Sequence, residues 1–237
     1  MKTKGIAILL ILALALSVAA CGNTAPTEAQ PQQAEPEAAE TPAPTPEATA
    51  KPSRAEQLLE KAQAGDGRSY TDLGKLYETG GSGVEQDYEK ALECYRLSAE
   101  AANPDFKGMR LAGLMYMEGR GVEQDYAEAA ACFEIAANAG DVSAAYFLGV
   151  LYEEGKGVEQ SAENAKLWYE KAVSTVEEFL ANTRNNGPDE LKLALCKLAE
   201  LALAEEDTET AIQYYQYAAQ LGWSEAQEKL TELGVTG

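Results

Sequence analysis

The segment GVEQDYEKALECY, from Gly83 to Tyr95, recurs twice along the chain with few changes. The second copy is GVEQDYAEAAACF, from Gly121 to Phe133, and the third is GVEQSAENAKLWY, from Gly157 to Tyr169. The copies start 38 and 36 residues apart, a period typical of arrays built from repeated pairs of helices. Units of such arrays bury their apolar faces against their neighbours, so the repeat predicts an all-helical solenoid.

Each copy predicts a helix that starts at a polar residue. Asp87, Asp125 and Ser161 are residue types that cap helix N-termini. Small and large residues then follow at offsets of 4 and 7, which place them on one helical face. They are Ala91, Tyr95 and Ser98 in the first copy, Ala129, Phe133 and Ala136 in the second, and Ala165, Tyr169 and Ala172 in the third.

A first helix is predicted before each copy. These helices contain LGKLYETG, AGLMYMEG and LGVLYEEG, which begin at Leu73, Ala112 and Leu148. Their glycines, Gly74, Gly113 and Gly149, lie mid-helix, where glycine costs about 1 kcal/mol relative to alanine. Because this cost is repeated, we expect close approach of a neighbouring helix there. The later G-x-G-V glycines lack the strand and the basic partner of a phosphate loop, and they predict helix ends.

The combined pattern, L-G-x-L-Y-x-x-G-x-G-V-x-x-x-x-x-x-A-x-x-W-Y-x-x-A, resembles the Sel-one-like repeat, a relative of the tetratricopeptide repeat. The third unit matches it at Leu148, Gly149, Leu151, Tyr152, Gly155, Gly157, Val158, Ala165, Trp168, Tyr169 and Ala172. The resemblance implies a right-handed α-α superhelical solenoid over residues 54–237 that binds protein or peptide on a concave surface. The last pair of helices, around Leu198 and Tyr215, has the shorter turn of a tetratricopeptide repeat. Residues 225–233 predict a polar-faced closing helix.

The first twenty residues predict a secretory signal. Lys2 and Lys4 precede an apolar run over residues 6–20, which is shorter than the roughly 20 residues of a membrane-spanning helix. Small residues then lead to Cys21, an arrangement that resembles the bacterial lipoprotein box, although Val18 stands where leucine is usual. We expect Cys21 to carry lipid and to anchor the chain outside the cytoplasm, at the cell membrane or outer membrane. The alternative is an ordinary cleaved signal that contains a cysteine.

Residues 21–53 predict the lipidated terminus and a disordered tether. The segment is rich in Pro, Ala, Glu and Thr and has no aromatic residue, so it cannot bury enough apolar surface to offset its ordering entropy. The 32 residues from Gly22 to Ser53 span roughly 30 Å as a flexible coil. The helical domain is thus expected to act at a distance from the lipid surface.

Charge and residue usage exclude several classes of partner. The chain has a net charge of −20, and residues 54–237 hold 34 acidic against 16 basic residues, a balance of −18. Nucleic acid and anionic lipid need the opposite sign, so neither is expected on the bulk surface. The sequence has no histidine and no cluster of metal ligands, and we expect neither metal nor cofactor. Cys94, Cys132 and Cys196 are expected to be buried, unpaired thiols.

One insertion interrupts the period. The chain from Ala172 to Ala194 has 14 residues more than the equivalent stretch of the preceding unit. Val173, Val176 and Leu180 continue the apolar spacing, which predicts a longer helix that breaks near residues 185–188. The insertion is either a tolerated loop or an edge that contacts a partner.

Three classes of function remain. An enzyme needs a positioned acid, base or nucleophile, and the chain has no Ser-x-x-Lys and no Gly-x-Ser-x-Gly. A binding scaffold is the main hypothesis, and catalysis is not expected. The alternatives are a cell-envelope enzyme that hydrolyses β-lactams or amides, and a passive surface spacer.

The binding surface is expected on the first helices, which the resemblance places on the inner wall. The positions predicted to face outward are Arg68, Thr71, Lys75, Lys107, Arg110, Leu114, Tyr146 and Val150. This wall runs from basic to apolar on a chain of strongly negative charge. It predicts an acidic protein or peptide partner whose carboxylates bind the basic end. The alternative is that these cations only solubilise the helices.

Overall fold

The computed structural model describes residues 52–181 and 187–235. Within these ranges the chain forms helices and no extended strand, apart from two isolated bridges. The helices are α1 (Arg54–Gln63), α2 (Gly67–Thr79), α3 (Tyr88–Glu100), α4 (Lys107–Glu118), α5 (Tyr126–Asn138), α6 (Val142–Glu154), α7 (Ala162–Val173), α8 (Val176–Ala181), α9 (Asp189–Ala204), α10 (Thr208–Gln220) and α11 (Ser224–Glu232). The predicted signal, Cys21 and the tether lie outside the described residues.

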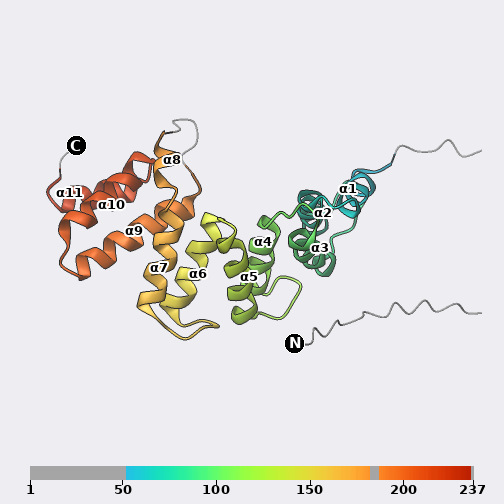
Figure 1. Ribbon diagram of the computed structural model, residues 1–237, viewed down its shortest axis with the longest axis horizontal. Helices are drawn as coiled ribbons and strands as arrows, with labels where there is room; N and C mark the ends of the chain where they lie inside the picture. The colour runs from blue at the N-terminus through green and yellow to red at the C-terminus, as the bar shows by residue number, and fades with distance from the viewer. Residues whose placement is uncertain (1–51, 182–186, 236–237) are drawn as a thin grey trace, which may run out of the picture. The chain divides into compact units, whose positions relative to one another are not determined.

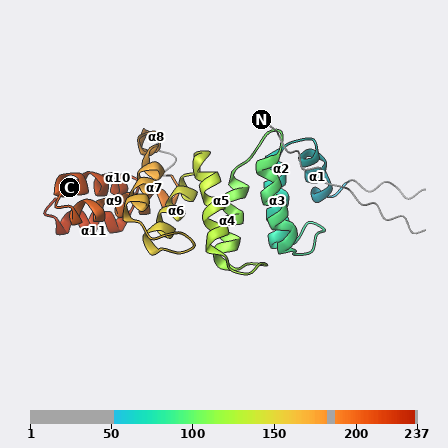
Figure 2. The ribbon, with the colours of Figure 1, turned by 60° about the horizontal axis from the view of Figure 1, so that its bottom comes forward.

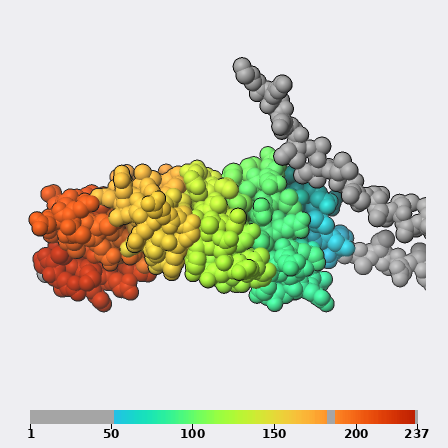
Figure 3. Space-filling model, turned by 90° about the horizontal axis from the view of Figure 1, so that it is seen from below, coloured from blue at the N-terminus to red at the C-terminus, as the bar shows by residue number. Residues whose placement is uncertain are grey.

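The helices stack in chain order. From α1 to α7, and again from α9 to α11, each helix packs against the next, and α7 packs against α9 (Figures 1 and 2). First helices also touch one another, since α2 contacts α4 and α6 contacts α9. In the space-filling view the green, yellow and red segments follow one another along the array (Figure 3). The predicted all-helical solenoid is confirmed.

The repeated segment GVEQD links the two helices of a unit at both of its ends. Gln124 donates its side-chain N–H to the carbonyl of Met117 over 2.7 Å, near the end of α4. Asp125 accepts from the backbone N–H groups of Ala127 and Glu128 and so caps the start of α5. The other units repeat this arrangement with Gln86 and Asp87 and with Gln160 and Ser161. The predicted N-caps are confirmed, whereas the glutamine bond was not foreseen.

The mid-helix glycines lie beneath aromatic rings. A Cβ atom added at Gly149 would stand 2.5 Å from Cε1 of Tyr169, and one at Gly74 would stand 2.5 Å from Cε1 of Tyr95. At Gly113 the nearest ring atom is Cε1 of Phe133, 2.6 Å away. Real Cβ atoms do not approach other atoms so closely, and all three rings are buried. The expected close approach of the neighbouring helix is confirmed.

Two of the three rings also hold a polar junction between units. Tyr169 donates its hydroxyl to Glu153 over 2.6 Å, and Glu153 accepts from Lys197 of the following unit over 3.0 Å. Tyr95 bonds to Glu78 in the same way, and Arg120 of the second unit pairs with that carboxylate. In the second unit the equivalent residues are Phe133 and Met117, so the carboxylate is present only where the ring has a hydroxyl to share.

The insertion differs from the prediction. Helix α7 ends at Val173 rather than continuing, and Ser174 and Thr175 separate it from the short helix α8. Val173 and Val176 are buried, as their apolar spacing predicts. Val173 and Val176 are three residues apart and both are buried, although the helix is interrupted between them. The sequence pattern records only this spacing, and for that reason it predicted one continuous helix.

No helix of the described residues is long and apolar enough to cross a membrane.

Candidate functional site

A polar hollow lies between the first and second units. It has a volume of about 290 Å³ and is lined by Arg68, Asp72 and Lys75 of α2, by Lys107 of α4, and by Asn103, Pro104 and Asp105 from the loop before α4. Three of the four basic residues expected on the wall therefore border one space. They come from two different units, so stacking brings them together.

The loop at the edge of the hollow is fixed by backbone hydrogen bonds. Asn103 donates its N–H to the carbonyl of Gly65 over 2.8 Å, and its own carbonyl accepts from Gly67 over 2.8 Å. The carbonyl of Asp105 accepts from the Ser98 hydroxyl over 2.9 Å. A loop held from both sides places the Asn103 amide and the start of α4 at defined positions beside the basic side chains.

The hollow carries a small positive balance. Nζ of Lys75 lies 3.6 Å from Oδ1 of Asp72, and the two side chains are 51% and 37% exposed, so this pair is weak. The Asp105 carboxylate accepts from the backbone N–H of Lys107 over 3.3 Å. Within the described residues, no carboxylate pairs with Arg68 or with the Lys107 ammonium group. Three cations against two carboxylates leave room for about one added negative charge.

Two of the predicted wall residues have other roles. Thr71 is 1% exposed, and its hydroxyl lies 3.4 Å from the carbonyl of Gly67, so its assignment to the outward wall was wrong. It lies three residues before Gly74 and therefore shares the buried face of α2. Arg110 is part-buried and bonds to Asp141 over 3.0 Å, while Asp141 caps the start of α6. Arg110 thus joins α4 to the next unit instead of facing the hollow.

The predicted apolar end of the wall is only half exposed. Leu114 on α4 and Val150 on α6 pack against the core with part of their surface free. The Tyr146 ring lies 5.6 Å from that of Phe147 and 5.9 Å from that of Tyr169, centroid to centroid. Burial raises the pKa of the Tyr146 phenol. These side chains offer apolar edges, and aromatic packing fixes the orientation of the tyrosine.

The sequence did not reveal the other residues of the hollow. Asp72, Asn103 and Asp105 border it, although none belongs to the wall positions derived from helical spacing. The signal available was the position of Asn103 and Asp105 in the loop that joins two units, just before Lys107. Loop residues of this kind meet a site only through stacking, which spacing along one helix does not describe.

Other chemistry finds little support in the described residues. They contain no group of three or more residues able to hold a metal ion. Cys94, Cys132 and Cys196 are free thiols, and burial raises the pKa of each to about 11. A thiol with that pKa is not ionised near neutral pH, so none of the three is an activated nucleophile.

Stacked helix pairs with a polar hollow on their first helices define a solenoid scaffold. A model of the Sel1 repeat matches residues 67–103, 107–141, 142–174 and 190–223, more than half of the chain, which therefore belongs to the Sel1 repeat family. Each match spans two helices, and the fourth covers α9 and α10. The last pair is thus a Sel1 repeat as well, although only residues 205–207 join its helices. Sel1 repeat proteins generally mediate protein–protein interactions.

Solved structures resemble the chain. A protective antigen of uropathogenic Escherichia coli strains with an SLR fold is 29% identical, with a TM-score of 0.61 over 74% of this chain and 35% of that protein. The chain therefore spans about a third of that antigen. A Sel1 repeat protein from Oxalobacter formigenes is 24% identical, with a TM-score of 0.58 over 75% of this chain and 73% of that protein, and it shows the fold alone. A search of the curated proteins found no match.

Proposed function

We propose that the chain is a membrane-anchored, extracytoplasmic scaffold that binds a protein or peptide through a carboxylate held in the hollow between α2 and α4. One observation carries this proposal. Arg68, Lys75 and Lys107 line a single space on a chain whose net charge is −20. Acidic residues outnumber basic residues in the rest of the chain. An anionic group of a partner is therefore attracted most strongly to this cluster of cations.

The chemistry of the hollow favours one carboxylate. Arginine can bind it with two parallel hydrogen bonds, and lysine adds a point charge. Asp72 and Asp105 repel a second negative charge, so a chain terminus or a single acidic side chain fits better than a long acidic run. The exposed edges of Leu114, Tyr146 and Val150 are assigned to apolar residues of the same partner.

Capture of a partner tests this assignment. The full chain is immobilised, incubated with envelope extract, and compared with a variant carrying Arg68→Glu, Lys75→Glu and Lys107→Glu. A matched variant reverses three exposed cations elsewhere, Arg96, Lys156 and Lys229. The partner should be lost from the first variant and retained by the second, with circular dichroism unchanged. Equal retention by both variants would move the binding site away from the hollow.

The anchor rests on sequence alone. The apolar run and the small residues before Cys21 support lipidation of that thiol. Detergent phase partitioning of the chain made in bacteria compares wild type with Cys21→Ser. Wild type should enter the detergent phase and the variant should remain in the aqueous phase. Equal partitioning would refute the lipid anchor without affecting the hollow.

A further inference from the structure

The array begins with half a unit. The turn between α1 and α2 repeats the turn between α5 and α6, which joins the second unit to the third. In both turns a glycine with positive φ, Gly65 (98°) or Gly140 (93°), donates its N–H to the carbonyl three residues earlier, over 2.9 and 3.1 Å. The next residue donates to the carbonyl five residues earlier, over 3.2 and 3.0 Å. The Sel1 matches begin at residue 67, so α2 is the first helix of a unit. Helix α1 therefore occupies the place of a second helix whose first helix is absent from the described chain.

The array ends with the opposite half. The turn between α10 and α11 has the same form, with Gly222 at a φ of 86° donating to Ala219 over 2.9 Å. Trp223 then donates to Ala218 over 3.0 Å. The fourth Sel1 match ends at residue 223, after the second helix α10, so α11 occupies the place of a first helix. The Sel1 matches begin after α1 and end before α11, which agrees with two incomplete units.

The equivalent surface inside the array is covered by a second helix. Superposing the two turns pairs Ala219 with Ala137, and Gln227 with Ala145. Ala137 and Ala145 are each 1% exposed, and they border a small space that Lys171 and other residues at the end of α7 help to line. No helix of the described chain occupies the place of α7 over Ala219 and Gln227.

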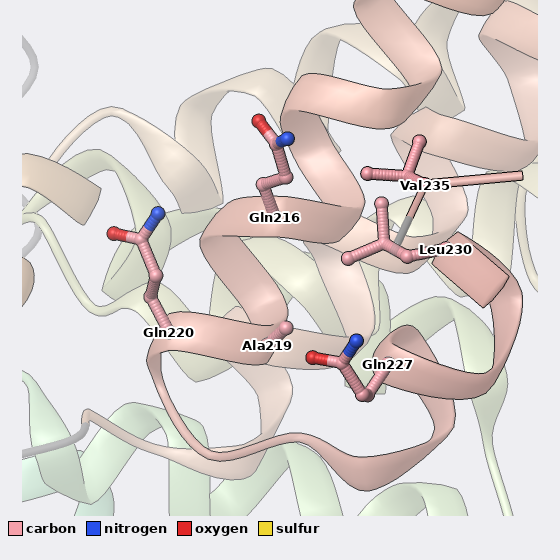
Figure 4. A pocket seen from close by; sticks show the side chains of 6 residues that line it. All are labelled: Gln216, Ala219, Gln220, Gln227, Leu230 and Val235. Carbon is pink, nitrogen blue, oxygen red and sulfur yellow. The ribbon is translucent and has the colours of Figure 1, made fainter. Parts of the chain in front are cut away.

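A hollow of about 390 Å³ remains at that place. Figure 4 shows it between α10 and α11, with glutamine side chains around Ala219 and Leu230. Gln216, Ala219 and Gln220 come from α10, Gln227 and Leu230 from α11, and Val235 from the residues that follow. The glutamine amides can hydrogen-bond to water when the surface is free. The apolar side chains, Ala219, Leu230 and Val235, can be buried by a docked helix.

The two half units also match in side-chain size. In complete units a glycine of the first helix, such as Gly149, lies under a large ring of the second helix, such as Tyr169. The same alignment places Thr231 of α11 at the glycine position and Leu58 of α1 at the ring position. Thr231 is larger than the glycine of a complete unit, and Leu58 is smaller than the aromatic ring that it replaces. The two changes in size therefore compensate each other. The neighbouring Leu59 is 40% exposed.

We propose that copies of this chain associate head to tail, with α1 of one copy docking as the missing second helix on α10 and α11 of the next. Helix α1 is prepared for this role, because Ser53 and Glu56 form a capping box that stabilises its start. The contact joins two different surfaces, so it leaves a free surface at each end and permits chains longer than two. This association is independent of the hollow between α2 and α4.

Crosslinking between copies tests the geometry. One full-length chain carries Leu59→Cys and the other, of different mass, carries Gln227→Cys, and both carry Cys21→Ser. They are mixed at about 0.1 mM and treated with a short bis-maleimide. The mixed dimer should form, and neither variant should crosslink to itself. Ile135→Cys, at a residue of α5 that is 44% exposed, replaces Leu59→Cys in the matched control and should form no mixed dimer.

A blocking substitution makes the test quantitative. Adding Gln216→Arg to the Gln227→Cys chain places a long side chain in the hollow and should lower the yield of mixed dimer at least about tenfold. Adding Gln213→Arg, an exposed residue elsewhere on α10, should leave the yield unchanged. A Leu59–Gln227 yield no higher than that of the Ile135 control overturns the proposal and leaves α11 as a closing helix alone. A yield that Gln216→Arg does not lower overturns the assignment of the hollow.

Discussion

Replacing Gly149 by alanine should destabilise the array, against the usual trend for helices. An exposed mid-helix glycine costs about 1 kcal/mol relative to alanine, so the same change on an open helical surface would stabilise the protein. At Gly149 the new Cβ would lie 2.5 Å from Cε1, 2.7 Å from Cδ1 and 3.1 Å from Cζ of Tyr169. The Tyr169 ring is 1% exposed and cannot swing into solvent.

The two effects oppose each other, and overpacking should prevail. Forcing an extra carbon into a packed core costs typically about 1–3 kcal/mol, from which the gain in helix propensity is subtracted. We expect a net loss of up to about 2 kcal/mol for Gly149→Ala, which lowers the midpoint of thermal unfolding by up to about 8 °C in a domain of this size. The same substitution at Gly74 should behave alike, because Tyr95 lies at the same distance.

Denaturant and thermal unfolding followed by circular dichroism measure this loss. The control variant Ala131→Gly measures the effect of helix propensity alone, because Ala131 is exposed in the middle of α5. This substitution should lower the stability by about 1 kcal/mol. If Gly149→Ala instead raised stability by the amount that Ala131→Gly lowers it, the ring above Gly149 would not limit the space. The explanation of the repeated glycines would then be wrong.

Three further predictions follow from the contacts inside the array. Tyr169→Phe should cost about 1 kcal/mol in urea unfolding, and adding Glu153→Met, which copies the second unit, should recover part of it. Burial alone would raise the pKa of Glu153, but the hydrogen bonds from Tyr169 and Lys197 outweigh burial and lower this pKa. The stabilisation that the Glu153 carboxylate gives to the folded state is therefore present above the ordinary pKa of glutamate and is lost as the pH falls below it. Cys132 should resist thiol reagents at pH 8 until the chain unfolds, because burial raises its pKa to about 11; labelling of the folded protein at the rate of a free thiol would contradict this. Asp125→Ala should cost about 1 kcal/mol in the same unfolding assay by removing the cap of α5, and no change in midpoint would refute that role.

The sequence predicted the features that depend on short spacing. The helix caps could be predicted because an N-cap is a local arrangement, and they are Asp87, Asp125 and Ser161. The repeated glycines indicated close approach of a neighbouring helix because a mid-helix glycine lowers helix stability and nothing within the helix compensates for that loss. The closing helix was expected over residues 225–233, and α11 covers Ser224–Glu232. Periodicity and capping are properties of one segment, so they can be read without the rest of the molecule.

The candidate site was harder to predict because stacking creates it. Three cations meet at the hollow, but Arg110 turns to Asp141, which lies 31 residues further along the chain. Thr71 was assigned to the wrong face because the wall was taken as the positions that Leu73, Gly74 and Tyr77 do not use, although a residue three before Gly74 shares its buried face. Asn103 entered the site through its bonds to Gly65 and Gly67, which join the loop before α4 to the start of α2 and have no counterpart in a one-helix pattern.

Protection of lysines gives the most direct test of carboxylate binding at the hollow. The full chain with its captured partner bound is treated briefly with an amine-acetylating reagent, and modification of each lysine is compared by mass spectrometry with that of the free chain. Lys75 and Lys107 should be protected by the partner, whereas Lys156 and Lys229, which are exposed on other helices and loops, should react equally in both states. Removing the partner's terminal or acidic carboxylate should abolish the protection. Unchanged reactivity of Lys75 and Lys107 in the complex would contradict the proposed site.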